Sequence, residues 1–143
     1  KSQVAERKGI NNNPSPEQIE NLKALAVNIL QPIRSHYNEA LQISSGFRCA
    51  ELCIAIGSSV NSQHVADDNA AAADFEIWGR DNKEVATFIK DNLEFDQLIL
   101  EFYKEGEPNS GWIHCSYSSN HNRNQCLYAS RGENGKTKYT PWV

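Results

Sequence analysis

Apolar side chains recur at helical spacing in the first part of the chain, directly after Ser15-Pro16-Glu17-Gln18. Ser15 and Gln18 can form a capping box, and Pro16 suits the first turn of a helix. Pro32 is expected to end or kink this helix, because proline has no amide hydrogen and its ring clashes with the preceding turn. The predicted buried stripe consists of Ile19, Leu22, Ala26, Ile29 and Ile33.

Two further helices are predicted. A short one covers residues 50–56 and stops at Gly57, a residue type that favours helix ends. A longer one covers residues 81–92, where Asp81 can cap the helix and Glu84 can complete a capping box. The buried positions of the longer helix are predicted to be Val85, Phe88 and Ile89.

Three segments alternate between apolar and polar side chains, as half-buried strands do. They span residues 73–78, 97–102 and 112–117. One face of each segment is apolar, and the opposite face carries a residue capable of chemistry. These three residues are Asp74, Glu101 and His114. A shorter alternating segment is predicted at 41–44, and an edge strand at 126–130.

The rest of the chain shows no such periodicity. Residues 1–13 are predicted to be a polar lead-in segment, and residues 131–143 a loose C-terminal tail. Residues 58–72 are predicted to form a loop, because Asp67-Asp68-Asn69 interrupts any apolar period. A length of 143 residues fits one domain, 1–143, with enough chain to bury a core without cross-links.

Charge and hydropathy exclude two classes of partner. The chain has 14 Lys and Arg against 18 Asp and Glu, and no basic stretch is dense enough to follow a phosphate backbone, so we expect no nucleic-acid binding. No apolar run is long enough for a membrane span, and no signal peptide precedes the first helix. Because the chain begins at Lys1 and has no Met, we expect its start to be trimmed.

The four cysteines are too sparse for a disulfide framework in a chain of this length. Cys49 and Cys53 are four residues apart, so together with Cys115 and Cys126 they could form a structural zinc site, although the spacing is not that of common zinc knuckles. We expect free and mostly buried thiols, because an unpaired cysteine behaves as a small apolar residue.

The residues with metal-ligand chemistry are His64, Asp74 and His114. Two imidazoles and one carboxylate, with a fourth position left for water, are the ligand set of a hydrolytic zinc site. Each of these residues taken alone is more typical of an ordinary loop or strand. The interpretation depends on their combination with other motifs in a fixed order.

That order resembles the M15 family of zinc D-Ala-D-Ala peptidases, and most closely its bacteriophage and prophage branch. The resemblance extends from about Gly9 to Tyr128. The motifs that carry it are, in chain order, Ser44-Ser45-Gly46-Phe47-Arg48, Ser62-Gln63-His64, Ala72-Ala73-Asp74-Phe75, Phe95-Asp96-Gln97-Leu98-Ile99 and Trp112-Ile113-His114.

The resemblance implies a fold and a set of residue roles. The implied fold is α+β, like that of the hedgehog domain and the DD-peptidases: a mainly antiparallel sheet of four or five strands, helices on one side, and zinc on the open face. Arg48 is implied to orient the substrate, and Ser62 and Trp112 to contact it or support the site. The implied Zn²⁺ ligands are His64, Asp74 and His114.

The resemblance also suggests the general base. Some relatives place an acid three residues before the last histidine, where this chain has Gly111. In the phage branch and in the hedgehog domain a glutamate ends the preceding strand, and Glu101 matches that position. The less favoured candidates are Glu76, Glu105 and Glu107.

One departure from the family pattern affects the ligand assignment. The family usually has His-x-x-Gly-x-Ala-x-Asp, whereas here His64 and Asp74 are ten residues apart and the glycine is missing. We interpret this as a three-residue insertion in the loop that keeps Asp74 as the ligand. Two alternatives are that Asp67 or Asp68 binds the metal instead, or that the zinc site is lost.

The implied activity is hydrolysis of peptide bonds in peptidoglycan stem peptides by a monomeric zinc metallopeptidase. It would be a D-Ala-D-Ala carboxypeptidase or an L-Ala-D-Glu endopeptidase, acting as an endolysin or a virion-associated enzyme. Such a protein would be phage-encoded, made in the host cytoplasm, and would act on the bacterial cell wall or in the periplasm. The alternatives are a zinc-containing binding module without turnover and a metal-free structural domain.

Overall fold

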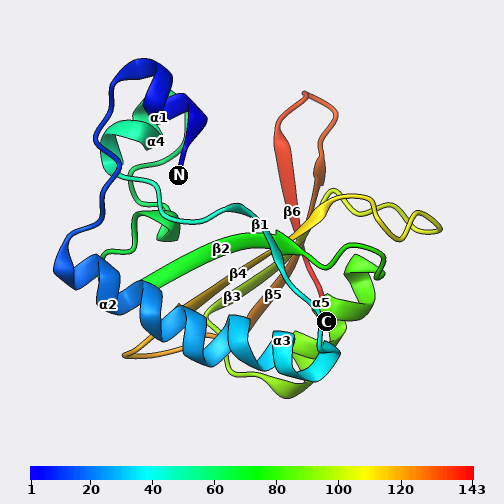
Figure 1. Ribbon diagram of the computed structural model, residues 1–143. Helices are drawn as coiled ribbons and strands as arrows, with labels where there is room; N and C mark the ends of the chain where they lie inside the picture. Colours follow the sequence, from blue (N-terminus) through cyan, green and yellow to red (C-terminus); the bar gives the residue numbers. More distant parts are fainter.

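The computed structural model describes residues 1–143, which form an α+β fold with one mixed sheet of six strands (Figure 1). The strand order is β1-β2-β4-β3-β5-β6, and every neighbouring pair is antiparallel except β3 and β5. The strands are β1 (Gln42–Ser45), β2 (Ala70–Glu76), β3 (Gln97–Glu101), β4 (Trp112–Ser118), β5 (Gln125–Arg131) and β6 (Thr137–Pro141). The helices are α1 (Gln3–Lys8), α2 (Pro16–Leu25), α3 (Gln31–Tyr37), α4 (Ala50–Ala55) and α5 (Asn82–Asn92).

Helices cover one face of the sheet and leave the other face open. The long helix from α2 to α3 runs along this face, with α2 against β2 and β4, while α5 packs on β3 and β4 (Figure 1). The core between these layers excludes water, and burying each large apolar side chain contributes about 1.5–3 kcal/mol. Its fully buried side chains include Ile29, Ile33, Phe75, Leu98, Leu100 and Ile113.

The predicted long helix does not end at Pro32. It continues to Tyr37, and a π-helical turn, η1 (Ala26–Leu30), lies directly before α3. A wider turn of this kind relieves the missing amide and the ring clash that proline causes within a helix. The predicted capping box at Ser15 and Gln18 is present, and Asp81 caps α5 as expected.

The sheet has more strands than the four or five predicted, because the expected loose tail contains β6. Strand β6 pairs with β5 along its whole length, so β5 is an internal strand rather than the predicted edge. The turn between them places Gly135 in the left-handed region at φ 77°, which a glycine adopts without strain. The segment is polar, and therefore its alternation gives no hydrophobic signal.

Two other segments differ from prediction. The lead-in residues 1–13 contain α1, which Ser2 caps. The predicted loop 58–72 contains a short 3₁₀ helix, η2 (Gln63–Val65), and β2 begins within it at Ala70. Alanine has a low strand propensity, but pairing of β2 with both β1 and β4 overrides that preference.

All four cysteines are free thiols, as predicted. Cys53 and Cys115 are buried, and Cys115 is part of the core. The pKa of the Cys115 thiol is raised well above its ordinary value by burial, so it stays protonated and unreactive. None of the helices combines the length and the apolar character that crossing a membrane would need.

Candidate metal and catalytic site

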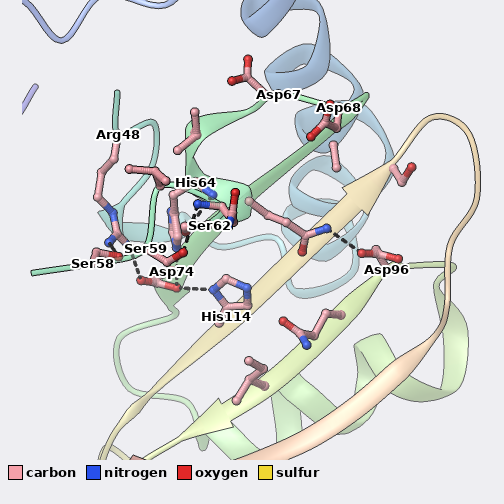
Figure 2. A pocket seen from close by; sticks show the side chains of 18 of the residues that line it. Arg48, Ser58, Ser59, Ser62, His64, Asp67, Asp68, Asp74, Asp96 and His114 are labelled. Atoms are coloured by element: carbon pink, nitrogen blue, oxygen red, sulfur yellow. Dashed lines mark hydrogen bonds and ion pairs between the residues drawn. The ribbon is translucent and has the colours of Figure 1, made fainter. Parts of the chain in front are cut away.

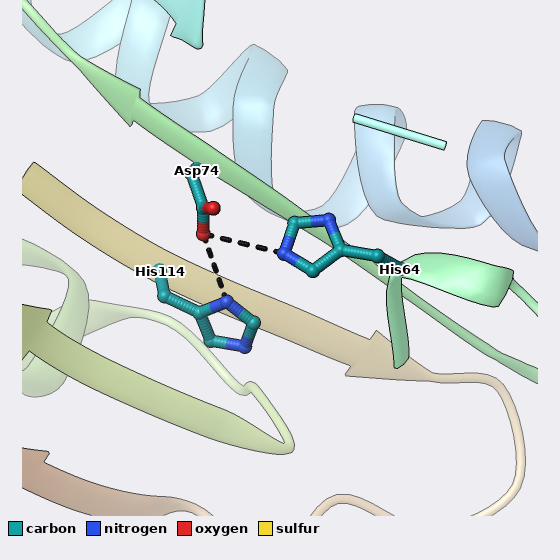
Figure 3. A group of neighbouring side chains, drawn as sticks. All are labelled: His64, Asp74 and His114. Carbon is teal, nitrogen blue, oxygen red and sulfur yellow. Dashed lines mark hydrogen bonds and ion pairs between the residues drawn. The ribbon is translucent and has the colours of Figure 1, made fainter. Parts of the chain in front are cut away.

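Strand pairing brings Asp74 and His114 together. Asp74 on β2 and His114 on β4 are direct partners in the antiparallel ladder. Their neighbours Phe75, Ile113 and Cys115 point into the core, so strand alternation turns Asp74 and His114 to the open face. His114 Nδ1 lies 2.9 Å from Asp74 Oδ1 (Figure 3).

His64 reaches the same carboxylate from the 3₁₀ helix η2. Its Nε2 is 3.3 Å from Asp74 Oδ1. Its Nδ1–H donates to the Gly46 carbonyl oxygen at 2.8 Å, which fixes the ring and leaves Nε2 free to act as a ligand atom. Ser62 caps η2, because its Oγ accepts a hydrogen bond from the His64 backbone amide at 3.2 Å. This is a supporting role for Ser62.

The geometry and charge of the three residues fit a divalent metal. One ligand atom from each residue lies within 4.8 Å of the others. Two ligands at ordinary zinc distances and tetrahedral angles are about 3.3 Å apart, close to the 2.9 and 3.3 Å separations from Asp74 Oδ1. Burial raises the pKa of Asp74, but its close contacts with His114 and His64 outweigh that rise and hold the pKa well below its ordinary value. The carboxylate is therefore anionic, as a metal ligand must be.

The alternative ligands Asp67 and Asp68 lie elsewhere. Both are exposed, and Figure 2 shows them at the rim of the cavity, away from Asp74 and His114. The extra residues between His64 and Asp74 therefore form part of the rim, while β2 carries Asp74 into the cluster. The arrangement favours Asp74 as the ligand.

Arg48 stands beside the cluster on the side of β1 and α4. Its Nε donates to Ser45 Oγ at 3.1 Å, and its Nη1 donates to Ser58 Oγ at 3.4 Å. Its Nη2 is 3.7 Å from Asp74 Oδ2, the oxygen that does not face the histidines. The side chain is 18% exposed, so it supports Asp74 and still presents a cationic surface to the cavity.

Glu101 lies on the same face of the sheet as Asp74 and His114, in the row of paired residues that contains Trp112. It ends β3 and pairs directly with Trp112 on β4, two residues before His114. The indole Nε1–H of Trp112 donates to Glu101 Oε2 at 2.7 Å. Burial raises the pKa of Glu101; among the smaller influences, His114 opposes this rise and Asp74 adds to it. The prediction that Glu101 shares the metal face therefore agrees with the geometry, and Trp112 holds the carboxylate in place.

Gly111, three residues before His114, is sterically required to be a glycine. Its φ is +65°, and a Cβ added to it would lie 2.0 Å from the carbonyl oxygen of Glu101. The turn into β4 thus passes directly over the end of β3. The buried Asn82 side chain also ties this turn to α5 by donating to the carbonyl oxygens of Ser110 and Gly111.

These groups line one open cavity of ≈ 980 Å³ (Figure 2). Two further lining residues make contacts that the sequence alone does not reveal. Asp96, directly before β3, accepts a hydrogen bond from Gln63 Nε2 at 2.6 Å and pairs with Arg123, which steadies the turn that carries His64. Tyr139 on β6 lines the cavity as well. Only the paired register of strands far apart in the sequence reveals these contacts.

Comparison with known protein families agrees with this site. The family model described as Peptidase M15 matches residues 1–116, which hold the cluster, Arg48, Glu101 and Trp112. The chain belongs to the peptidase M15 family. Neither a curated protein nor a solved structure matches the chain.

Membership of the peptidase M15 family supports a metallopeptidase that acts on peptidoglycan peptides. M15 peptidases depend on a metal, and here the His64-Asp74-His114 cluster can bind one. His36 and His121, the other two histidines, are exposed and lie outside the cluster.

Proposed function

We propose that the protein is a zinc metallopeptidase that hydrolyses peptide bonds in peptidoglycan stem peptides, as an endolysin-like or virion-associated wall-degrading enzyme. The observation that carries the proposal is one open cavity holding both a metal-binding cluster and a separate partly buried carboxylate, Glu101. A structural metal site has four protein ligands and no such neighbour, whereas a catalytic site has three and an open position.

Zinc is the metal that this donor set fits best, because imidazole nitrogens and one carboxylate in a tetrahedral arrangement are typical zinc ligands. His64, Asp74 and His114 would hold it. When bound, the ion supplies Lewis acidity that polarises the scissile carbonyl and favours ionisation of water.

Glu101 carries the proton in this proposal. A general base works best when its pKa lies closer to the working pH than that of an exposed carboxylate. Burial moves the pKa of Glu101 in that direction, and the Trp112 hydrogen bond occupies Oε2. Oε1 is then available to take a proton from the attacking water and to deliver it to the amine that leaves.

Arg48 orients the peptide. Its guanidinium is fixed by Ser45 and Ser58 and lines the cavity, so it can hold a carboxylate or carbonyl of the substrate without losing further side-chain entropy. Both the carboxypeptidase and the endopeptidase type of M15 reaction fit this role. The openness of the cavity to solvent suits a stem peptide that stays attached to a polymer.

The test combines metal analysis with an activity assay on purified peptidoglycan. We expect one zinc per chain and release of amines from the wall material by the wild type. Asp74→Ala should lose both zinc and activity, whereas Glu101→Gln should keep the zinc and lose the activity. Zinc without amine release by the wild type would instead favour a binding module, and a chain that takes up no metal would overturn the proposal.

A further inference from the structure

The C-terminal hairpin contributes Tyr139 to the lining of the cavity, although the hairpin lies beyond the family match. The match ends at residue 116, while β5 and β6 span residues 125–141. Figure 1 shows the β5–β6 hairpin projecting past the other strands. The cavity lining thus extends beyond the residues that the family model matches, and the residue that the hairpin contributes is Tyr139.

Strand register places Tyr139 in line with the proposed general base. Trp112 pairs with Glu101, Glu101 with Ala129, and Ala129 with Tyr139, so one row crosses β4, β3, β5 and β6. Residues in one row share a face of the sheet, and neighbouring strands are about 4.8 Å apart. Ala129 is small and 3% exposed, so no bulky side chain separates Glu101 from the tyrosine.

The environment of the phenol keeps it a hydrogen-bond donor. Tyr139 is 53% exposed, and its partial burial, together with the negative charges of Glu101 and Asp74, raises its pKa. The hydroxyl therefore keeps its proton at neutral pH, because even an unshifted phenol titrates well above it. Tyr139 lines the same cavity as the metal cluster, and a neutral O–H in such a cavity can stabilise negative charge that develops on a carbonyl oxygen.

Arg48 and Tyr139 occupy different walls of the cavity. Arg48 comes from the β1–α4 side and is already bound to Ser45, Ser58 and Asp74. Tyr139 comes from β6 at the other end of the row through Glu101. A peptide that crosses the metal cluster would therefore meet a cation on one side and a phenol on the other.

We propose that Tyr139 is a further catalytic residue, which donates its phenolic hydrogen bond to the scissile carbonyl oxygen of the bound peptide as negative charge develops there. This inference rests on the proposed peptidase function. It assigns to the hairpin a direct part in turnover.

The test is removal of the hydroxyl alone. Tyr139→Phe should lower kcat for soluble muropeptides by about tenfold or more, with KM changed less than twofold, because the bond forms mainly in the transition state. Zinc content and melting temperature should match the wild type. Tyr128→Phe is the control: it removes a hydroxyl from the same hairpin, on the core side, where Tyr128 stacks on Trp142.

Two results would overturn the inference while leaving the peptidase function intact. One is an active wild type with Tyr139→Phe within twofold of it in kcat. The other is a Tyr139→Phe variant with the kcat and KM of the wild type together with a Tyr139→Ala variant in which only KM rises. The aromatic ring would then contact the substrate without taking part in the reaction. A wild type that releases no amines at all would instead refute the proposed function.

Discussion

Replacing Trp112 with phenylalanine should shift the pH at which the enzyme gains activity. The indole donates a 2.7 Å hydrogen bond to Glu101 Oε2, and such a bond favours the ionised carboxylate. Hydrogen bonds to charged groups contribute about 1.5–3 kcal/mol, which corresponds to about one to two pH units. Because Glu101 is only partly buried, the lower value applies, so the pKa of Glu101 should rise by about one unit.

The assay is kcat for soluble muropeptides from about pH 4 to about pH 9. In the wild type the acid limb should lie above 4.5, the ordinary pKa of glutamate, because burial raises the pKa of Glu101. In Trp112→Phe the limb should move upward by about one pH unit, while kcat on the plateau above it stays close to the wild type. Trp78→Phe, at a tryptophan that is 71% exposed, is the matched control and should leave the profile unchanged.

Either of two results would refute this reasoning. If the acid limb of Trp112→Phe stays at the wild-type pH or moves lower, Glu101 is not the group that limits activity in acid. If kcat falls equally at every pH, the tryptophan acts by supporting the fold or the substrate rather than by holding the carboxylate.

Three further predictions concern the metal, the contacts of Asp96 that steady the turn carrying His64, and the turn into β4. A chelator should lower the melting temperature of the wild type and of the rim variant Asp67→Ala, because a bound metal stabilises the folded chain. It should not lower the melting temperature of Asp74→Ala, which is expected to bind no metal. A metal-free Asp67→Ala variant would contradict the ligand assignment. Burial raises the pKa of Asp96, but hydrogen bonds from Arg123 and Gln63 outweigh it and hold that pKa at about 2, below its value in the unfolded chain. The ionised carboxylate therefore stabilises the fold above about pH 4, and this contribution is lost as the pH falls toward 2. The pKa shift corresponds to about 2.5 kcal/mol of stability, and screening by water around the 49% exposed Arg123 reduces it to about 1 kcal/mol. Urea unfolding should therefore show the wild type to be more stable than Asp96→Asn by about 1 kcal/mol at pH 7, with the difference lost at pH 2. Gly111→Ala should lower the free energy of unfolding, measured in urea, by more than about 1 kcal/mol, and it should also reduce kcat for amine release. A Gly111→Ala variant as stable as the wild type would contradict the steric argument.

The sequence was sufficient to predict the parts of the site that depend on local alternation. Asp74, Glu101 and His114 each stand on a strand whose other face is apolar, so the face they occupy could be read directly. His64 has no periodic pattern, and only its position within a family motif indicated a role. The structure adds the reason for its placement, which is the bond from Nδ1–H to Gly46.

What the sequence could not reveal depends on register between distant segments. Strand β6 is polar and exposed on much of its length, so no apolar period marks it, and Tyr139 appeared to be part of a tail. The contact between Gln63 and Asp96 joins a loop to a strand 33 residues away and follows no spacing rule. Trp112 lies on a predicted strand, but its hydrogen bond to Glu101 follows only from the pairing of β3 with β4.

The steric demand at Gly111 limits where this fold could place the proposed general base. A carboxylate at position 111 would need a Cβ, and that atom would overlap the carbonyl oxygen of the residue now proposed as the base. Moving the acid from Glu101 to position 111 therefore requires the turn between β3 and β4 to be rebuilt, and no single substitution can accomplish it.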